Sequence, residues 1–155
     1  MRLRTRRIEA DDPIPYELLL LADPSRRLVD EYVRRGECRL AFDDERAAAP
    51  IGVYVLIRTR PDTVEIVNIA VVESLHGLGI GKRLVLDAIA QARSMGARTV
   101  EIGTGNSSVA QLALYQKCGF RVTGVDRNFF VRHYPDPIVE NGIPCLDMIR
   151  LRLEL

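Results

Sequence analysis

The chain has few of the side chains that bind metal ions or form disulfides. Its 155 residues include three cysteines and two histidines. Cys38, Cys118 and Cys145 are odd in number and far apart, without the spacing of metal ligands. We therefore expect reduced thiols packed as small hydrophobic residues, no metal site, and a cytoplasmic protein.

Long apolar runs and an excess of charge of one sign are also absent. No stretch approaches the about 18 apolar residues of a membrane-spanning helix, and the basic start MRLRTRR is followed by no apolar signal-peptide core. The net charge of +1, with 28% charged residues, gives no reason to expect binding to nucleic acid or to an anionic membrane. With 47% hydrophobic residues, the chain is expected to fold as a single domain, residues 1–155.

The most informative segment that is present is NIAVVESLHGLGIGK at Asn68–Lys82. An apolar run of strand character is followed by glycines at alternate positions, Gly77, Gly79 and Gly81, and then by a helical pattern of apolar residues. The first N–H groups of a helix lack partners within the helix and lie at the positive end of its dipole, and glycine lets an anion approach the backbone closely. This order of elements predicts a site for a phosphate-bearing ligand.

The glycine spacing disfavours two other phosphate loops. A Walker loop would need glycine at His76 and Ser or Thr at Arg83. A dinucleotide fingerprint begins correctly at Gly77-Leu-Gly79 but has Lys82 where its third glycine belongs, so a dehydrogenase is a weak alternative. A glycine turn that binds nothing is another alternative, although it would not explain the entropic cost of three glycines beside a helix start.

The spacing that does match is Q/R-x-x-G-x-G/A, the pyrophosphate loop of the GCN5-related N-acetyltransferases (the GNAT family), with His76-Gly-Leu-Gly79-Ile-Gly81 in its place. The resemblance continues through the following helix to LYQKCGF at Leu114–Phe120 and covers about residues 51–122. It implies an α/β fold, with a mixed, partly parallel central sheet flanked by helices. It also implies acetyl-CoA as the cosubstrate, with no metal.

Local patterns give an order of elements that agrees with this fold. We expect strands at Arg2–Ile8, Cys38–Asp43, Ile51–Thr59, Thr63–Val72, Thr99–Thr104, Phe120–Val131 and Leu146–Leu153. We expect helices at Pro13–Ala22 and Pro24–Arg35, each opened by its proline, from Gly79 to Met95, and from a capping box at Ser108–Gln111 to Gly119. The strand at 99–104 should run parallel to the strand at 63–72, as a right-handed crossover requires.

The resemblance also assigns the cofactor contacts. It implies that pantetheine lies in a gap between the two parallel strands and hydrogen-bonds the backbone of Ile69, Ala70 and Val71, which also polarises the thioester carbonyl. The pyrophosphate would bind the loop formed by His76, Gly77, Leu78, Gly79, Ile80, Gly81 and Lys82. Family members have a cofactor-binding asparagine seven residues before the tyrosine of the LYxKxGF segment. Here Ser108 has that position and Asn106 lies two residues earlier, so both are candidates.

Acetyl transfer to an amine needs a proton donor for the departing thiolate and a base for the amine. The resemblance implies that Tyr115 is the donor, with a purely structural place in the core as the alternative. Glu65 and Glu101 each interrupt an apolar strand, where a lone carboxylate is costly to bury. Glu101 is the first choice for the base, because its position relative to Asn106 matches some family members, and Glu65 is the second. No cysteine is placed to form an acyl-enzyme, so transfer should occur directly in a ternary complex.

The acceptor is expected to be a primary amine of a small molecule or a protein. The segment HYPDPIVENGIPCLD at His133–Asp147 has the composition of a loop, with three acids and no Lys or Arg. If this segment forms the rim of the acceptor site, its net charge of −3 would favour a cationic amine, held by Asp136 or Glu140. The alternative is that these acids are merely solvated. A different acyl-CoA donor and a non-catalytic coenzyme A-binding module are the alternatives. No feature decides between a monomer and the homodimer that is common among relatives.

Overall fold

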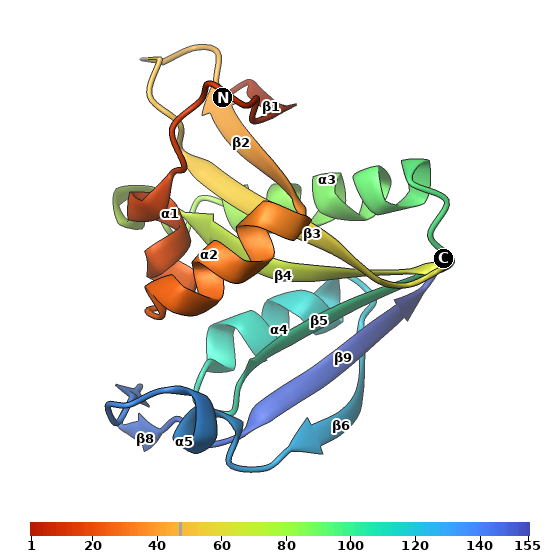
Figure 1. The fold of residues 1–155 in the computed structure, drawn as a ribbon. Helices are drawn as coiled ribbons and strands as arrows, with labels where there is room; N and C mark the ends of the chain where they lie inside the picture. The colour runs from red at the N-terminus through yellow and green to blue at the C-terminus, as the bar shows by residue number, and fades with distance from the viewer. Residues whose placement is uncertain (47) are drawn as a thin grey trace.

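The computed structural model describes residues 1–46 and 48–155. Its elements are β1 (Leu3–Arg7), α1 (Tyr16–Ala22), α2 (Arg26–Arg35), β2 (Glu37–Asp43), β3 (Gly52–Arg60), β4 (Thr63–Val71), η1 (Glu73–Leu75), α3 (Ile80–Ser94), β5 (Thr99–Gly105), α4 (Val109–Lys117), β6 (Arg121–Asp126), α5 (Phe129–His133), β7 (Val139–Glu140), β8 (Ile143–Pro144) and β9 (Met148–Glu154). Seven strands form one sheet in the order β1-β2-β3-β4-β5-β9-β6, and β7 and β8 form a small separate ladder (Figure 1).

The large sheet is mixed, as the sequence predicted. β4 and β5 pair in parallel, and the other neighbours in the sheet pair antiparallel. The parallel pair is connected through α3, so that a strand, the glycine turn, a helix and a second strand follow one another as a crossover unit. In Figure 1, β4 and β5 lie together near the C-terminus of the chain and move apart toward their other ends.

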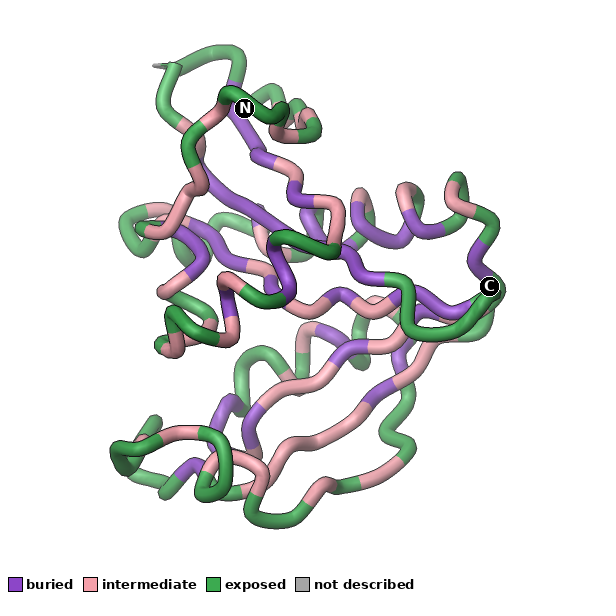
Figure 2. Tube along the Cα trace, viewed as in Figure 1, coloured by how far each residue is buried: buried purple, intermediate pink, exposed green. Residues whose placement is uncertain are grey.

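Helices cover both faces of the sheet. On one face α1 and α2 pack on β2, β3 and β4, with Leu19 and Val29 fully buried. On the other face the buried side of α3, which includes Leu84 and Ala88, joins a larger core that also contains Tyr115 of α4. Figure 2 shows the buried residues following the central strands and the inner sides of these helices. Within the described residues no helix is long and apolar enough to cross a membrane.

Two predicted helix starts were wrong. α1 begins at Tyr16 rather than at Pro13, because Ile14 precedes Pro15 and a residue before proline is pushed away from helical backbone angles. α2 begins at Arg26, where the Ser25 hydroxyl oxygen accepts a hydrogen bond from the Leu28 N–H at 3.2 Å. Neither proline therefore forms a first helical turn, and a serine cap replaces one of them.

The C-terminal third also differs from its prediction. The strand predicted at 120–131 ends at Asp126, because Asn128 adopts left-handed angles (φ 61°) and starts the short helix α5. Asp147 stabilises this reversal by accepting a hydrogen bond from the Asn128 N–H at 2.8 Å. The segment predicted as a loop at 133–147 contains the β7–β8 ladder.

Candidate active site

A gap opens in the sheet where β4 and β5 separate. Their parallel pairing ends at Ile66, which lies opposite Ile102. At the same point the β3–β4 register shifts, so that Val67 is an extra residue and bends β4. Beyond it, in the part of the chain that the structure describes, β4 pairs with β3 only, whereas β5 stays paired with β9 as far as Gly105. The gap implied by the family resemblance is thus present.

The predicted backbone donors and acceptors lie along this gap. Ile69, Ala70 and Val71 pair with β3 on one side, and within the described residues no strand pairs with their other side. Unpaired N–H and C=O groups on a strand edge accept an extended ligand as if it were a further strand. One of these groups is already engaged, because the His76 Nε2 atom lies 2.8 Å from the Val71 carbonyl oxygen. This contact ties the glycine turn to the end of β4.

The glycine turn presents the start of α3 without a covering side chain. Gly77 (φ 83°) and Gly79 (φ 79°) both have left-handed backbone angles, and Gly79 is the residue before the first helical turn. Among the described residues no side chain caps this helix, and a Cβ atom placed on either glycine would meet none of their atoms within 4 Å. Free N–H groups, the positive end of a helix dipole and open space around the backbone together suit a phosphate.

The remaining predicted residues of the turn divide into exposed and buried positions. Leu78 and Lys82 are exposed, whereas Ile80 is 2% exposed and packs in the core. The side chain of Ile80 therefore cannot contact a ligand at the surface, and only its N–H can contribute. Lys82 acts on the Cys118 thiol near the end of α4, where its positive charge lowers a pKa that burial raises more strongly.

Tyr115 is buried, and its ring packs edge-on against Phe120 with 6.3 Å between the ring centres. Burial raises the pKa of its hydroxyl above the ordinary value for tyrosine. Within the described residues the Tyr115 hydroxyl makes no hydrogen bond. Its oxygen is nevertheless not fully buried, so it retains contact with solvent. A core position and a proton-donating role are therefore compatible for this tyrosine.

Glu65 and Glu101 lie opposite each other on β4 and β5, just before the gap. They point away from the core that contains Val64 and Tyr115, so they occupy the face of the sheet shared with α1 and α2. The Arg60 guanidinium forms a 2.7 Å ion pair with Glu101. Glu65 has a looser neighbour, Arg150, at 3.7 Å.

The two carboxylates therefore differ in their environment. Burial raises the pKa of Glu65, and the negative charge of Glu101 raises it further, although Arg150 and Arg35 act in the opposite direction. A raised pKa makes a carboxylate a stronger base, whereas a close ion pair occupies the oxygen that would accept the proton. Of the two predicted bases, the contacts favour Glu65.

The residues predicted at the start of α4 have structural partners. The Asn106 side chain donates to the Pro144 carbonyl at 3.0 Å and accepts from the Leu146 and Asp147 N–H groups at 2.8 and 3.0 Å. The Ser108 hydroxyl donates to Glu140 at 2.9 Å and caps no N–H of the helix, so the predicted capping box is not formed. Cofactor contacts of Asn106 and Ser108 remain predictions.

The predicted acidic rim is also partly engaged. The Glu140 carboxylate accepts hydrogen bonds from both Ser107 and Ser108, at 3.2 and 2.9 Å. Asp147 accepts one from the backbone of Asn128, as described above. Asp136 is exposed. Two of the three acids accept hydrogen bonds from the protein itself. The structure therefore supports binding of a cationic acceptor by these acids less strongly than the sequence did.

Sequence reasoning missed a polar bridge across the mouth of the gap. Asp23, between α1 and α2, accepts hydrogen bonds from the Tyr134 hydroxyl at 2.7 Å and from the Tyr32 hydroxyl at 3.0 Å. The Tyr32 oxygen in turn accepts one from the Asn68 amide of β4 at 2.8 Å. Tyr134 follows α5, of which residues 129–131 were predicted as part of a strand, and it lies itself in the segment predicted as a loop, so no sequence signal placed it beside Asp23.

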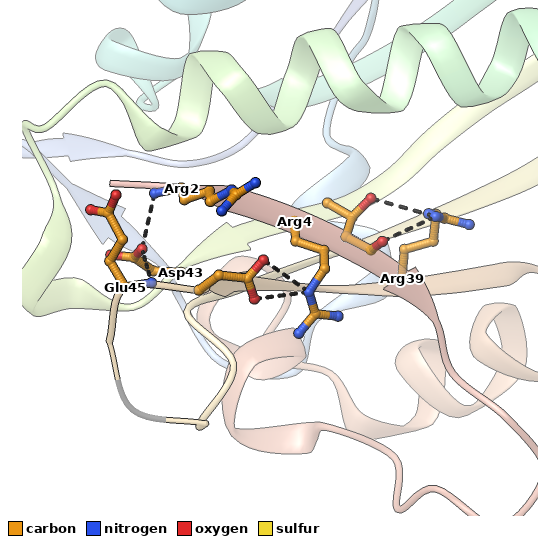
Figure 3. A network of polar contacts seen from close by, with 7 residues as sticks. Arg2, Arg4, Arg39, Asp43 and Glu45 are labelled. Atoms are coloured by element: carbon orange, nitrogen blue, oxygen red, sulfur yellow. Dashed lines mark hydrogen bonds and ion pairs between the residues drawn. The ribbon is translucent and has the colours of Figure 1, made fainter.

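A hollow of the described surface lies away from this gap. A volume of about 350 Å³ is bounded by the β1–β2 edge and the turn after β2, with Arg4, Arg6 and Phe42 among its lining residues. Figure 3 shows that the charges here satisfy one another: Arg4 pairs with Asp44 at 2.9 Å, and Asp43 accepts from the Arg2 N–H at 3.0 Å. This edge is a self-contained network rather than a second ligand site. No cluster of three or more potential metal ligands occurs in the described residues.

Comparison with known proteins agrees with this geometry. The family model described as "Acetyltransferase (GNAT) family" matches residues 5–120. The chain is 61% identical over 147 residues to a protein named uncharacterised N-acetyltransferase YvbK of Bacillus subtilis, covering 95% of this chain and 92% of that one. Two solved structures each cover 99% of both chains. One is a GNAT family acetyltransferase from Elizabethkingia anophelis with acetyl-CoA bound (49% identity, TM-score 0.95), and the other a Bacillus subtilis acetyltransferase in complex with CoA (58% identity, TM-score 0.92).

Proposed function

This chain belongs to the GNAT family of acetyltransferases and is an acetyl-CoA-dependent N-acetyltransferase; we propose that it transfers the acetyl group directly to a primary amine within a ternary complex. The observation that carries the proposal is the strand edge of β4 beyond Val67. Within the described residues this edge has no strand partner on the β5 side, and the chain continues through η1 and the glycine turn to the uncapped start of α3. One extended ligand with a pyrophosphate at one end would satisfy both features.

The two faces of the sheet supply the two proton transfers in this proposal. Tyr115 belongs to the core on the α3–α4 face, and Glu65 lies on the opposite face, next to the point where the gap begins. The amine would approach from the face of Glu65, which takes its proton directly or through a water. The thiolate would receive a proton from Tyr115, whose raised pKa keeps the hydroxyl protonated at neutral pH.

Backbone groups complete the proposed site. The N–H groups of β4 after the bulge would hydrogen-bond the thioester carbonyl, where negative charge develops as the amine attacks. Neither a metal ion nor an acyl-enzyme is part of this mechanism. Cys118 lies at the end of α4, and burial raises the pKa of its thiol, which disfavours the nucleophilic thiolate.

A binding assay followed by a turnover assay tests the proposal. We expect acetyl-CoA to raise the melting temperature of the purified chain, whereas NAD and NADP should leave it unchanged. A panel of primary amines with acetyl-CoA should then release free CoA, detected as thiol, only in the presence of an accepted amine. Stabilisation by a dinucleotide alone, or acetyl-CoA binding without thiol release from any small-molecule or peptide amine, would contradict the proposal.

A further inference from the structure

Arg150 lies beside the start of the gap, on the face of the sheet that carries Glu65 and Glu101. On β9 it lies opposite Gly103, the first β5 residue after the parallel pairing with β4 ends. A Cβ atom at position 103 would come within 2.7 Å of the Met148 sulfur and 3.4 Å of the Arg150 Nη1 atom. The glycine therefore leaves room for the Arg150 side chain over β5, directly beside the start of the gap.

The Arg150 guanidinium is held by its charge rather than by hydrogen bonds. Its Nη1 atom is 3.7 Å from the nearest Glu65 oxygen, which is beyond hydrogen-bond distance, and its central carbon lies 5.8 Å from the centre of the Phe129 ring. No hydrogen bond from this guanidinium is found in the described residues, and its side chain is 37% exposed. By contrast, Arg60 forms an ion pair with Glu101 at 2.7 Å, so close ion pairs do form with a carboxylate on this face.

Glu65 and Arg150 thus present a negative and a positive group side by side at the place where an acceptor must meet the thioester. We propose that the acceptor is an amine that also carries a carboxylate, as an amino acid does, and that Arg150 binds this carboxylate while Glu65 faces the amino group. The inference rests on the proposed function and specifies its acceptor.

Charge and geometry support this acceptor class over a polyamine. A guanidinium with unused N–H donors binds a carboxylate through paired, charge-assisted hydrogen bonds. An amino acid has opposite charges that match those of Glu65 and Arg150. A polyamine would instead bring a second cation toward Arg150. The acids that the sequence suggested for a cationic amine include Glu140, which is bound by Ser107 and Ser108.

The test compares amines that differ only in the carboxylate. Tyrosine and tyramine, tryptophan and tryptamine, and lysine and cadaverine are assayed with acetyl-CoA. For at least one pair, kcat/KM of the wild-type chain should favour the amino acid by about ten- to a hundred-fold, the value of a charged hydrogen-bonding group. Arg150→Met should bring that ratio close to one, mainly through KM, and Arg150→Lys should give an intermediate ratio.

Arg152→Met is the matched control, because Arg152 lies two residues further along β9, on the same face, opposite Glu101. It removes the same charge but should leave the ratio unchanged. Equal losses in the two methionine variants would mean that general electrostatics, not a carboxylate contact, sets the preference, and this would overturn the inference. Preference for the decarboxylated amines would overturn it while leaving the proposed function intact. Failure of every amine in a chain that binds acetyl-CoA would overturn both.

Discussion

Burial raises the pKa of both Tyr115 and Glu65, yet the chemical consequence is opposite for the two side chains. A tyrosine with a raised pKa keeps its proton over the whole physiological range and can donate it to a departing thiolate. A carboxyl group with a raised pKa gives a carboxylate that binds a proton more strongly, and this suits a base. The same desolvation thus keeps a hydroxyl protonated on one face of the sheet, where it can hydrogen-bond a departing thiolate, and strengthens a base on the other.

Replacement of Tyr115 by phenylalanine should separate its chemical role from its packing role. The ring and its contact with Phe120 are retained, and only the hydroxyl is lost. Loss of a proton donor lowers turnover by about a hundred-fold or more. We expect that loss in kcat with little change in the Kd for acetyl-CoA and in the melting temperature. Wild-type turnover in this variant would make Tyr115 a core residue only.

Glu65→Gln should lower kcat/KM by a similar factor, whereas Glu101→Gln, the matched control on the opposing strand, should have a much smaller effect. The choice follows from the contacts, because Arg60 holds Glu101 at 2.7 Å. The kcat/KM of the wild-type chain should rise with pH through the raised pKa of Glu65, and this acidic limb should disappear in Glu65→Gln. If Glu101→Gln is the variant that removes the limb, the base is Glu101, as the sequence first suggested.

The same raised pKa has a consequence for stability. Between the unfolded and the folded pKa of Glu65 the folded chain binds more protons, so stability falls as the pH rises through this window. Glu65→Gln cannot ionise and avoids that loss. We expect its melting temperature relative to wild type to increase as the pH rises from the ordinary glutamate pKa, about 4.3, through the raised pKa of the folded chain. A difference that does not depend on pH would mean that Glu65 is not desolvated.

At the scale of elements, the sequence was most informative where structure is local. The glycine turn and the helix after it were predicted from their spacing alone, because Gly77 and Gly79 supply left-handed angles that other residues rarely adopt. α5 could not be predicted in this way. Its start depends on Asn128 in a left-handed conformation, and that conformation is supported by Asp147, nineteen residues away. The pairing of Arg150 with Glu65 likewise needs the register of three strands.

The turn can be tested at Gly81, which lies in the first turn of α3. A Cβ atom here would meet only the Leu114 side chain at 3.5 Å, an ordinary contact, so a substitution should fold. We expect Gly81→Glu to weaken acetyl-CoA binding at least about ten-fold, because it places a negative charge where we propose that the pyrophosphate binds. Gly81→Ala is the control for bulk and should bind nearly as the wild type does. Equal affinities of the glutamate and alanine variants, measured by calorimetry, would argue against an anion site at this helix.

At the scale of the whole molecule, the sheet consists of two parts joined by a short seam. β1 to β4 lie on one side, and β5, β9 and β6 on the other, and the seam is the parallel pairing of Thr63–Ile66 with Thr99–Ile102. The bridge between Asp23 and Tyr134 connects the two parts at the open end, and the residues are 111 positions apart in the sequence. A contact of this kind depends on the complete fold, and the sequence around either residue does not predict it.

Tyr134→Phe should therefore loosen the molecule at the mouth of the gap. It removes one hydrogen bond to a charged group, which costs about 1.5–3 kcal/mol, or less where water replaces the lost partner. Amide hydrogen exchange should speed up in α5, in the β7–β8 ladder and in the turn between α1 and α2, and stay unchanged in β2 and β3. Tyr16→Phe is the matched control, because its hydroxyl also bonds an aspartate, Asp30 at 2.5 Å, but within one part of the molecule. Its faster exchange should be confined to α1 and α2. If the two variants change the same amides, Asp23 and Tyr134 do not connect the two parts in solution.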